Sequence, residues 1–323
     1  MTLLGKMKND ILHGKLIDKQ EALAISMMPL DELASAANDI REYFCGKIFD
    51  ICTIANAKSG KCSENCKYCA QSSYHHTQVE EYALLSTEAL LKQAQYNDER
   101  GVLRYSIVTS DKRLNDAEVN KVCESIKLIK EQTDISVCVS LGLLNEKQFE
   151  KLNNAGVERI HNNLETSENN FQNVCTTHTY YDKINSIKAA QKAGLNVCSG
   201  GIMGLGESME DRIDMVIAIR ELGIRSIPVN ILNPIKGTPY ENHKIMTGNE
   251  MSRIVALFRF LVPMASIRLA GGRGLLPDKG RQCFLSGANA AISGDMLTTA
   301  GITIEADMKM LGEIGYIIGR WNE

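Results

Sequence analysis

Short runs rich in β-branched residues alternate with helical patterns along most of this chain, and that alternation restricts the possible folds more than any other feature. The strand candidates span residues 49–54, 104–108, 135–139, 159–164, 195–199, 226–232 and 266–269, with a weaker eighth at 288–293. Helical patterns separate them at 87–94, 116–131, 146–155, 181–193, 210–222 and 249–261. Several of these helices are expected to stop at a glycine, namely Gly156, Gly194 and Gly223.

Eight strands alternating with helices predict an α/β fold of the (β/α)8 TIM-barrel type, which needs about 250 residues. We assign the barrel to residues 46–300 of the 323. Residues 1–45 then form an N-terminal helical extension, and residues 301–323 form a short tail with a helix over 308–321. An open, doubly wound sheet is the alternative fold.

Polar and sulfur-containing side chains interrupt seven of the predicted strands, although parallel strands covered on both faces are normally continuous apolar runs. These residues are Cys52, Ser106, Cys138, His161 with Asn163, Cys198, Asn230 and Arg268. Each one alone is explained by a hydrogen-bonded place in the core. Because they recur in successive strands, we expect them to line one interior cavity that holds a polar ligand or a metal cluster.

Three cysteines follow the first predicted strand at C-x3-C-x2-C spacing: Cys62, Cys66 and Cys69. Three thiolates cannot complete a tetrahedral zinc site. They can ligate three irons of a cubane cluster and leave the fourth iron open to an external ligand. Their βα loop is expected at the C-terminal mouth of the barrel, where active sites of this fold lie. A zinc site completed by His75, by His76 or by another cysteine is the alternative.

The remaining composition restricts the compartment and the partners. A net charge of −3 argues against nucleic-acid binding, and no apolar run is long enough to cross a membrane. The chain starts without a signal-peptide pattern, so we expect a cytoplasmic protein whose ten cysteines stay reduced. Three of those cysteines, Cys45, Cys123 and Cys283, fall on or beside predicted helices and are expected to be structural. His75 and His76 are expected in a solvated loop.

The cysteine spacing resembles that of the radical S-adenosylmethionine superfamily, and residues 49–300 resemble the biotin synthase family. The matching segments are residues 62–72, 161–167, 197–207, 228–232, 236–239, 267–273 and 287–289. The resemblance implies an enzyme that uses a [4Fe–4S] cluster and S-adenosylmethionine to form a 5′-deoxyadenosyl radical. It further implies sulfur insertion at C6 and C9 of dethiobiotin, with the sulfur drawn from a second Fe–S cluster. A homodimer, and an electron donor such as flavodoxin or ferredoxin, are expected as well.

Individual roles follow from the same resemblance. Cys62, Cys66 and Cys69 would hold the [4Fe–4S] cluster. The residues expected around S-adenosylmethionine are Tyr68, Thr109, Ser110, Asn163, Glu165 and Ile202. Glu165 stands where the family usually has Asp, and it keeps both acceptor oxygens. Asn163 and Asn230 are expected to contact the substrate, because an amide can both donate to and accept from a cyclic urea.

The second cluster is where this sequence departs from the family. Well-known members use cysteines on strands two, three and five and an arginine on strand seven; Cys138, Cys198 and Arg268 match three of these positions. Strand two carries Ser106 instead, and serine is a poor ligand for a soft metal site. Cys52 on strand one is the expected replacement, and Cys175 near His178 is a further possible contact. The auxiliary cluster is therefore expected to be either [2Fe–2S] or a four-iron cluster with an additional sulfide.

Two other readings of the sequence remain open. One is a radical enzyme of the hydrogenase-maturase or methylornithine-synthase type, against which Cys138, Cys198 and Arg268 argue. The other is a non-catalytic Fe–S or zinc protein. Such a protein would not cleave S-adenosylmethionine, whereas the enzyme should release 5′-deoxyadenosine.

Overall fold

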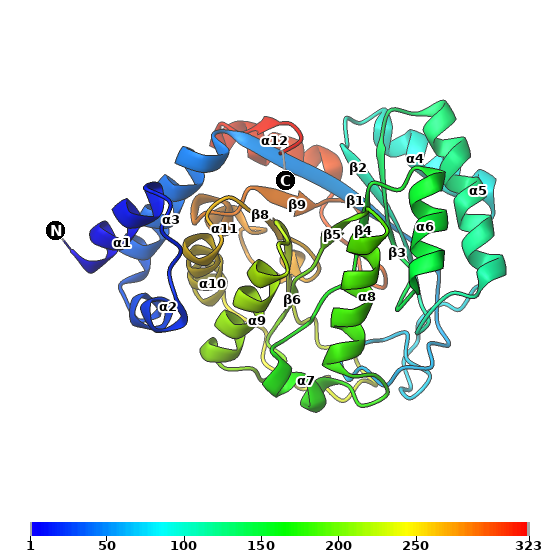
Figure 1. The fold of residues 1–323 in the computed structure, drawn as a ribbon, viewed down its shortest axis with the longest axis horizontal. Coiled ribbons are helices and arrows are strands. Elements are labelled where there is room, and N and C mark those ends of the chain that lie inside the picture. Colours follow the sequence, from blue (N-terminus) through cyan, green and yellow to red (C-terminus); the bar gives the residue numbers. More distant parts are fainter. Residues whose placement is uncertain (1, 322–323) are drawn as a thin grey trace.

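The computed structural model describes residues 2–321 and contains a closed barrel of eight parallel strands surrounded by helices (Figure 1). The order is β1–β2–β3–β4–β5–β7–β8–β9, and the pairing of β9 with β1 closes the ring. The barrel strands are β1 (Ile48–Lys58), β2 (Arg104–Thr109), β3 (Ser136–Ser140), β4 (Arg159–His161), β5 (Asn196–Cys198), β7 (Ser226–Ile231), β8 (Ser266–Leu269) and β9 (Ala290–Ile292). The predicted (β/α)8 TIM-type barrel is confirmed, and the open-sheet alternative is wrong.

The two faces of a barrel strand have different chemistry, because successive side chains point to opposite sides. In β1, Phe49 and Ile51 belong to the main hydrophobic core under the helices. Cys52 and Ile54 line the interior cavity instead. The polar residues that interrupt the strand patterns therefore lie on the inner face.

A short strand that the sequence patterns did not predict, β6 (Gly201–Met203), pairs with β7 after β5 has ended. Ser199 and Gly200 belong to neither strand, so they separate β5 from β6. A Cβ on Gly200 would lie 1.9 Å from the carbonyl oxygen of Pro228, so only glycine fits at this approach.

Most of the surrounding helices begin at a side-chain cap, and they cover the outside of the barrel (Figure 1). Five of them start with a capping box, in which the side chains of the first and fourth residues bond each other's backbone amides. The helices that follow strands are α4 (Thr87–Asp98), α5 (Asp116–Gln132), α6 (Glu146–Ala155), α7 (Glu168–Val174), α8 (Tyr180–Lys192), α9 (Met209–Glu221), α10 (Gly248–Leu261), the 3-10 helix η1 (Arg273–Leu275) and α11 (Arg281–Leu285). The expected glycine stops are confirmed, since Gly156, Gly194 and Gly223 all adopt positive φ.

The N-terminal extension contains α1 (Leu3–Leu12), α2 (Lys19–Ser26) and α3 (Leu30–Cys45). Helix α3 packs against α10, and α2 packs against α9 and α10. Arg253 of α10 donates hydrogen bonds to the carbonyl oxygens of Ser26 and Met28, which satisfies acceptors at the end of α2. These three helices thus pack on one side of the barrel (Figure 1).

The C-terminal helix lies earlier than the sequence predicted. It is α12 (Ile304–Ile314), it ends at Gly315 with φ 92°, and β10 (Ile317–Ile318) then pairs with β1. The predicted helix over 308–321 is therefore wrong, because a left-handed glycine ends the helix there. Asp307 of α12 is fully buried and accepts hydrogen bonds from Arg273 and Ser293. The tail is therefore tied to the end of β9.

No helix within residues 2–321 combines the length and the apolar character needed to cross a membrane.

Candidate active site

A cavity of about 390 Å³ opens at the C-terminal ends of the barrel strands. It gathers most of the residues singled out from the sequence onto one surface. Those that line it are Cys52, Cys62, Tyr68, Cys69, Thr109, Ser110, Cys138, Asn163, Glu165, Cys198, Ile202, Asn230 and Arg268. Cys66 and Cys175 do not line it. The polar and sulfur-containing residues of the strands therefore line one interior cavity, as their recurrence in successive strands predicts.

The outer cysteines lie on the loop between β1 and α4. The sulfur-bearing residues Cys62, Cys66 and Cys69 are half-buried. Backbone hydrogen bonds join the amide of Cys69 to the carbonyl of Cys66, and the amide of Cys62 to the carbonyl of Gln71, both at 3.0 Å. Burial raises the pKa of Cys69 to about 11. Metal binding would therefore have to release a proton from this thiol.

Two polar residues at the end of β2, Thr109 and Ser110, line the cavity together with Cys62 and Cys69. The hydroxyl of Ser110 donates to the carbonyl oxygen of Gly60 at 2.8 Å, just before the cysteines. The hydroxyl of Thr109 is buried and, among the described residues, has no hydrogen-bond partner. A buried polar atom without a partner costs free energy unless a ligand satisfies it. Thr109 therefore suits a polar ligand beside the cysteine loop.

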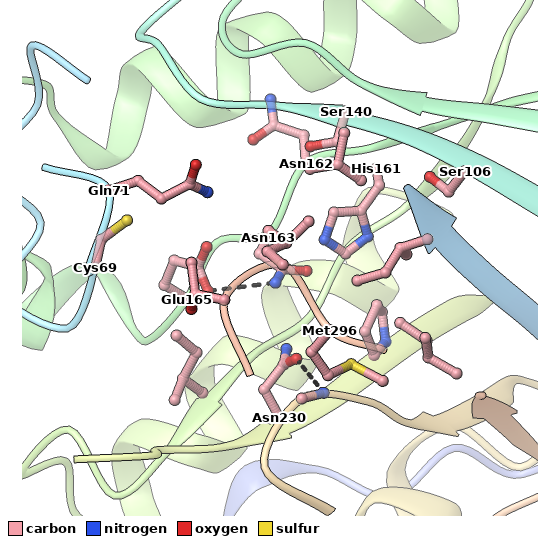
Figure 2. A pocket seen from close by; sticks show the side chains of 18 of the residues that line it. Cys69, Gln71, Ser106, Ser140, His161, Asn162, Asn163, Glu165, Asn230 and Met296 are labelled. Carbon is pink, nitrogen blue, oxygen red and sulfur yellow. Dashed lines mark hydrogen bonds between the residues drawn. The ribbon is translucent and has the colours of Figure 1, made fainter. Parts of the chain in front are cut away.

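Asn163 and Glu165 follow β4 and face the centre of the cavity (Figure 2). The Asn163 Nδ2 donates to Glu165 Oε2 at 3.3 Å, and its Oδ1 accepts from the amide of Gly200 at 3.1 Å. Glu165 holds φ 71°, a left-handed conformation that is unusual for a residue with a side chain. Burial raises the pKa of Glu165, opposed by Lys183 and by a hydrogen bond with Tyr68. A polar ligand that donates hydrogen bonds would stabilise its ionised form.

Asn230 on β7 is held at both ends of its amide. Its Oδ1 accepts from the amide of Gly271 at 2.9 Å (Figure 2), and its Nδ2 donates to the carbonyl of Gly201 at 3.1 Å. A Cβ on Gly271 would approach Asn230 Oδ1 to 3.1 Å, so glycine keeps this contact short. The amide keeps a second hydrogen and a second lone pair for a ligand.

The inner cysteines lie on three different strands. Cys52 is on β1, Cys138 on β3 and Cys198 on β5, and all three are buried. Ser106 on β2 pairs in register with Cys138 and carries the hydroxyl where the family pattern has a thiol. Burial raises the pKa of Cys52 to about 12 and that of Cys138 to about 11. Without a metal, these thiols are neutral at pH 7.

Positive charge surrounds the inner thiols. Arg268 Nη1 lies 3.3 Å from Cys52 Sγ. Arg159 on β4 pairs in register with Cys138. The pKa of Cys138 is raised by burial, and Arg159 followed by Arg104 acts to lower it. Each guanidinium therefore favours a thiolate over a thiol, which is what a metal cluster needs.

A buried carboxylate organises two of these arginines, and the sequence reasoning missed it. Asp50 on β1 accepts from Arg268 Nη2 and from Arg104 Nε, each at 3.0 Å. Burial opposes ionisation of Asp50, but Arg268 and Arg104 outweigh it and hold its pKa below the usual range. The sequence did carry a signal for this ion pair, because an aspartate inside a strand that is buried on both faces needs a cationic partner.

Cys175 lies with the outer cysteines and not with the inner ones. It follows α7, its Sγ lies 3.6 Å from Cys66 Sγ and 3.2 Å from His178 Nδ1, and it does not line the cavity. The prediction that Cys175 contacts the auxiliary cluster is not supported by this position. The reason is that α7 intervenes between β4 and Cys175 and carries the thiol out to the loop of the outer cysteines.

The two adjacent histidines lie in this outer region. His76 is exposed, and His75 is partly buried with its Nε2 3.0 Å from the carbonyl oxygen of Cys66. The ring of His75 therefore contacts backbone. His161, by contrast, lies inside the cavity, where burial lowers its pKa to about 4.

Family models match two parts of the chain. The Radical SAM superfamily model matches residues 57–219, and the Biotin and Thiamin Synthesis associated domain matches residues 228–317. Solved structures of low identity show the shared fold. A methylornithine synthase superposes with a TM-score of 0.85 at 17% identity, covering 98% of both chains. HydG, a maturase of the [FeFe]-hydrogenase, superposes with a TM-score of 0.80 at 19% identity, covering 98% of this chain and 74% of that one.

Curated relatives are far more similar in sequence. Biotin synthase of Brachyspira hyodysenteriae is 59% identical over 315 residues, covering 98% of this chain and 95% of that protein. Biotin synthase of Akkermansia muciniphila is 59% identical over 316 residues, covering 98% of both chains. Biotin synthase of Clostridium botulinum is 55% identical over 316 residues, covering 98% of this chain and 99% of that protein. With this identity over nearly its whole length, the chain belongs to the biotin synthase family of radical S-adenosylmethionine enzymes.

Proposed function

We propose that this chain converts dethiobiotin to biotin by inserting one sulfur atom at C6 and C9, with the sulfur taken from an auxiliary cluster inside the barrel. The observation that carries the proposal is the shared cavity. Cys62 and Cys69 of the outer loop line it together with all three inner cysteines. A carbon radical formed at the mouth would therefore meet a sulfur source in the same enclosed space.

The residues present fit the groups that the family implies. Cys62, Cys66 and Cys69 would hold a [4Fe–4S] cluster, and Cys52, Cys138 and Cys198 the auxiliary cluster. When bound, the clusters and S-adenosylmethionine supply the electron, the 5′-deoxyadenosyl radical that removes hydrogen atoms from C–H bonds, and the sulfur. The protein supplies binding, orientation and exclusion of water.

S-adenosylmethionine would be held by residues from several strand ends. Thr109 brings its unpartnered buried hydroxyl, and Ser110 fixes the backbone of the cysteine loop. Glu165 offers two acceptor oxygens to the ribose hydroxyls, and Tyr68 and Ile202 form walls of the same cavity. Neutral donors on a bound ribose would favour the carboxylate form of Glu165.

Dethiobiotin would be oriented by Asn163 and Asn230, whose side chains line the cavity that both sets of cysteines share (Figure 2). Both side chains are already anchored, Asn163 to Gly200 and Asn230 to Gly271. Anchored amides lose little conformational entropy when they bind the ureido ring. The fixed orientation would present the reacting carbons to the radical and then to the sulfur.

We further propose that the auxiliary cluster contains four irons and an additional sulfide, with [2Fe–2S] as the alternative. Guanidinium groups on β2, β4 and β8 approach the thiols of Cys52 and Cys138. A cluster with an extra sulfide carries more negative charge than a [2Fe–2S] unit on the same thiolates, so these arginines stabilise it better. Iron and acid-labile sulfide counts on a chain lacking Cys62, Cys66 and Cys69 test this, and a [2Fe–2S] content would contradict it.

The activity is tested by anaerobic reconstitution with iron and sulfide, followed by addition of S-adenosylmethionine, a strong reductant and dethiobiotin. Mass spectrometry should detect both 5′-deoxyadenosine and biotin. Deoxyadenosine without biotin would contradict the proposed substrate. If neither product forms with fully loaded clusters, the enzyme proposal fails.

Three accompanying features are also proposed, two from the family and one from the cysteine content. A small electron-transfer protein such as flavodoxin or ferredoxin would supply electrons, and the chain would act as a homodimer. A chain with ten cysteines suits a compartment that keeps thiols reduced, so we propose a cytoplasmic location. Sedimentation of the loaded chain should give twice the mass of 35.7 kDa; a monomer would contradict the dimer.

A further inference from the structure

A thiol that the proposed chemistry does not use lies next to a cluster ligand. Cys175 Sγ is 3.6 Å from Cys66 Sγ. A disulfide has an S–S bond of about 2.05 Å, so the two sulfur atoms would need to approach each other by about 1.5 Å. Both residues are on loop segments, Cys66 between β1 and α4 and Cys175 directly after α7.

Hydrogen bonds between the two loop segments hold the pair together. The amide of Lys67 donates to the carbonyl oxygen of Val174 at 3.0 Å. The side-chain Oδ1 of Asn65 accepts from the amides of Thr176 at 2.9 Å and Thr177 at 3.2 Å. The residues flanking each cysteine are thus bonded to those flanking the other. Holding two reactants side by side in this way raises their effective concentration.

A histidine and a carboxylate complete the surroundings of Cys175. His178 Nδ1 lies 3.2 Å from Cys175 Sγ and 2.5 Å from Glu64 Oε2. Both of these side chains are buried. Because Glu64 Oε2 accepts from this same ring nitrogen, Nδ1 carries a hydrogen, and its N–H also lies within reach of Cys175 Sγ, where it can donate to a thiolate, the nucleophile in thiol–disulfide exchange.

We propose that Cys66 and Cys175 form a reversible disulfide when the outer cluster is absent and a low-molecular-weight disulfide serves as the oxidant. One thiolate attacks the reagent RSSR and releases RSH, and the second thiol then displaces the other RSH. The protein gains one S–S bond, and the two protein thiols lose two electrons and two protons in total. The bond would protect Cys66 from irreversible oxidation and would block cluster assembly until a dithiol reduces it.

Peptide mapping tests the proposal on the full chain. The iron is removed anaerobically with a chelator, oxidised glutathione is added, and remaining thiols are alkylated before tryptic digestion without reductant. Cleavage after Lys67 separates Cys66 from Cys69, so the cysteines fall on peptides 62–67, 68–92 and 160–183. We expect peptide 62–67 linked to peptide 160–183, with fragmentation placing the link at Cys66. A link between peptides 62–67 and 68–92 would overturn the proposed Cys66–Cys175 disulfide. Recovery of Cys175 in alkylated or glutathionylated form would overturn it as well.

Two matched substitutions separate a specific bond from general thiol reactivity. Cys175→Ser should abolish the linked peptide. Cys123→Ser should leave it unchanged, because the half-buried Cys123 contacts the carbonyl oxygen of Lys151 on α6. As a second readout, the oxidised wild-type chain should take up less iron from ferrous iron and sulfide, and dithiothreitol should restore the uptake. Full uptake without dithiothreitol would show that the bond does not block assembly.

Discussion

The outer and inner cysteines of this barrel differ in almost every physical respect. Cys62, Cys66 and Cys69 are close in sequence, half-buried and on a loop. Cys52 and Cys198 are 146 residues apart in the chain, but both are buried inside the barrel. The comparison teaches that the outer site depends on one loop, whereas the inner site depends on closure of the whole barrel. The inner site should therefore be better shielded and more closely coupled to stability.

Loss of an inner ligand should produce the largest effect and separate the two sites. Cys52→Ala should lower biotin formation by about 100-fold or more, while S-adenosylmethionine cleavage continues, because the outer cysteines are untouched. Mass spectrometry of biotin and 5′-deoxyadenosine measures both. Cys283→Ala, a change at a buried thiol beside Ser252, is the control and should retain biotin formation. If the Cys52→Ala variant forms biotin at the wild-type rate, Cys52 is not a ligand of the auxiliary cluster.

Neutralising the inner carboxylate should destabilise the barrel. Asp50→Asn leaves Arg104 and Arg268 without their buried anion and should cost about 3 kcal/mol in the free energy of unfolding. The half-exposed ion pair of Asp214 with Lys19 provides a control, since Asp214→Asn should cost less than about 1 kcal/mol. Urea unfolding measures both. Equal losses of unfolding free energy in the two variants would show that the buried carboxylate contributes no more to stability than the half-exposed one.

The same carboxylate gives a pH dependence with a definite sign. The folded-state pKa of Asp50 lies below the ordinary aspartate pKa of 3.8, so the ionised form is favoured in the folded chain. Its contribution to stability is present above pH 3.8 and is lost as the pH falls through the folded pKa. Unfolding curves of the wild type should show this acid loss, and Asp50→Asn should show less of it.

Glu165→Gln should separate binding from stability. Without the carboxylate, the Kd for S-adenosylmethionine should rise about tenfold, as expected for losing a charge-assisted hydrogen bond. Burial raises the folded pKa of Glu165, so its stability contribution is complete below the ordinary glutamate pKa of 4.5 and declines as the pH rises through the folded pKa. The unloaded Gln variant should therefore gain up to about 1 kcal/mol at pH 8. Calorimetry measures both, and a stability loss at pH 8 would contradict the burial argument.

The smallest expected effect concerns the attachment of the outer loop. Asn65→Ala removes the acceptor for the amides of Thr176 and Thr177 and should cost about 1 kcal/mol. Outer iron should be lost severalfold faster to a chelator, while inner iron is retained at the wild-type rate. Asn120→Ala, which removes an exposed contact with Lys151, serves as the control. Equally fast loss from both sites would mean that the loop is not independent.

Sequence patterns predicted the features that local periodicity encodes. The eight barrel strands and the glycine stops were confirmed, because each depends on residues within a few positions of one another. Strand β6 and the end of α12 were missed. The first depends on a backbone approach between Gly200 and Pro228, and the second on Gly315 taking a left-handed conformation. The approach of Gly200 to Pro228 has no periodic signature, whereas the stop at Gly315 is of the same local kind as those at Gly156, Gly194 and Gly223 and was overlooked.

The sequence by itself determined the barrel, the C-x3-C-x2-C loop and the family, since these rest on local spacing and on residue identity. Only the tertiary structure placed Cys175 beside Cys66 and Asp50 between Arg104 and Arg268. These contacts join residues 109, 54 and 218 positions apart in the chain. The physical reason is that burial and charge pairing depend on distances in space, and closure of the barrel brings those residues together.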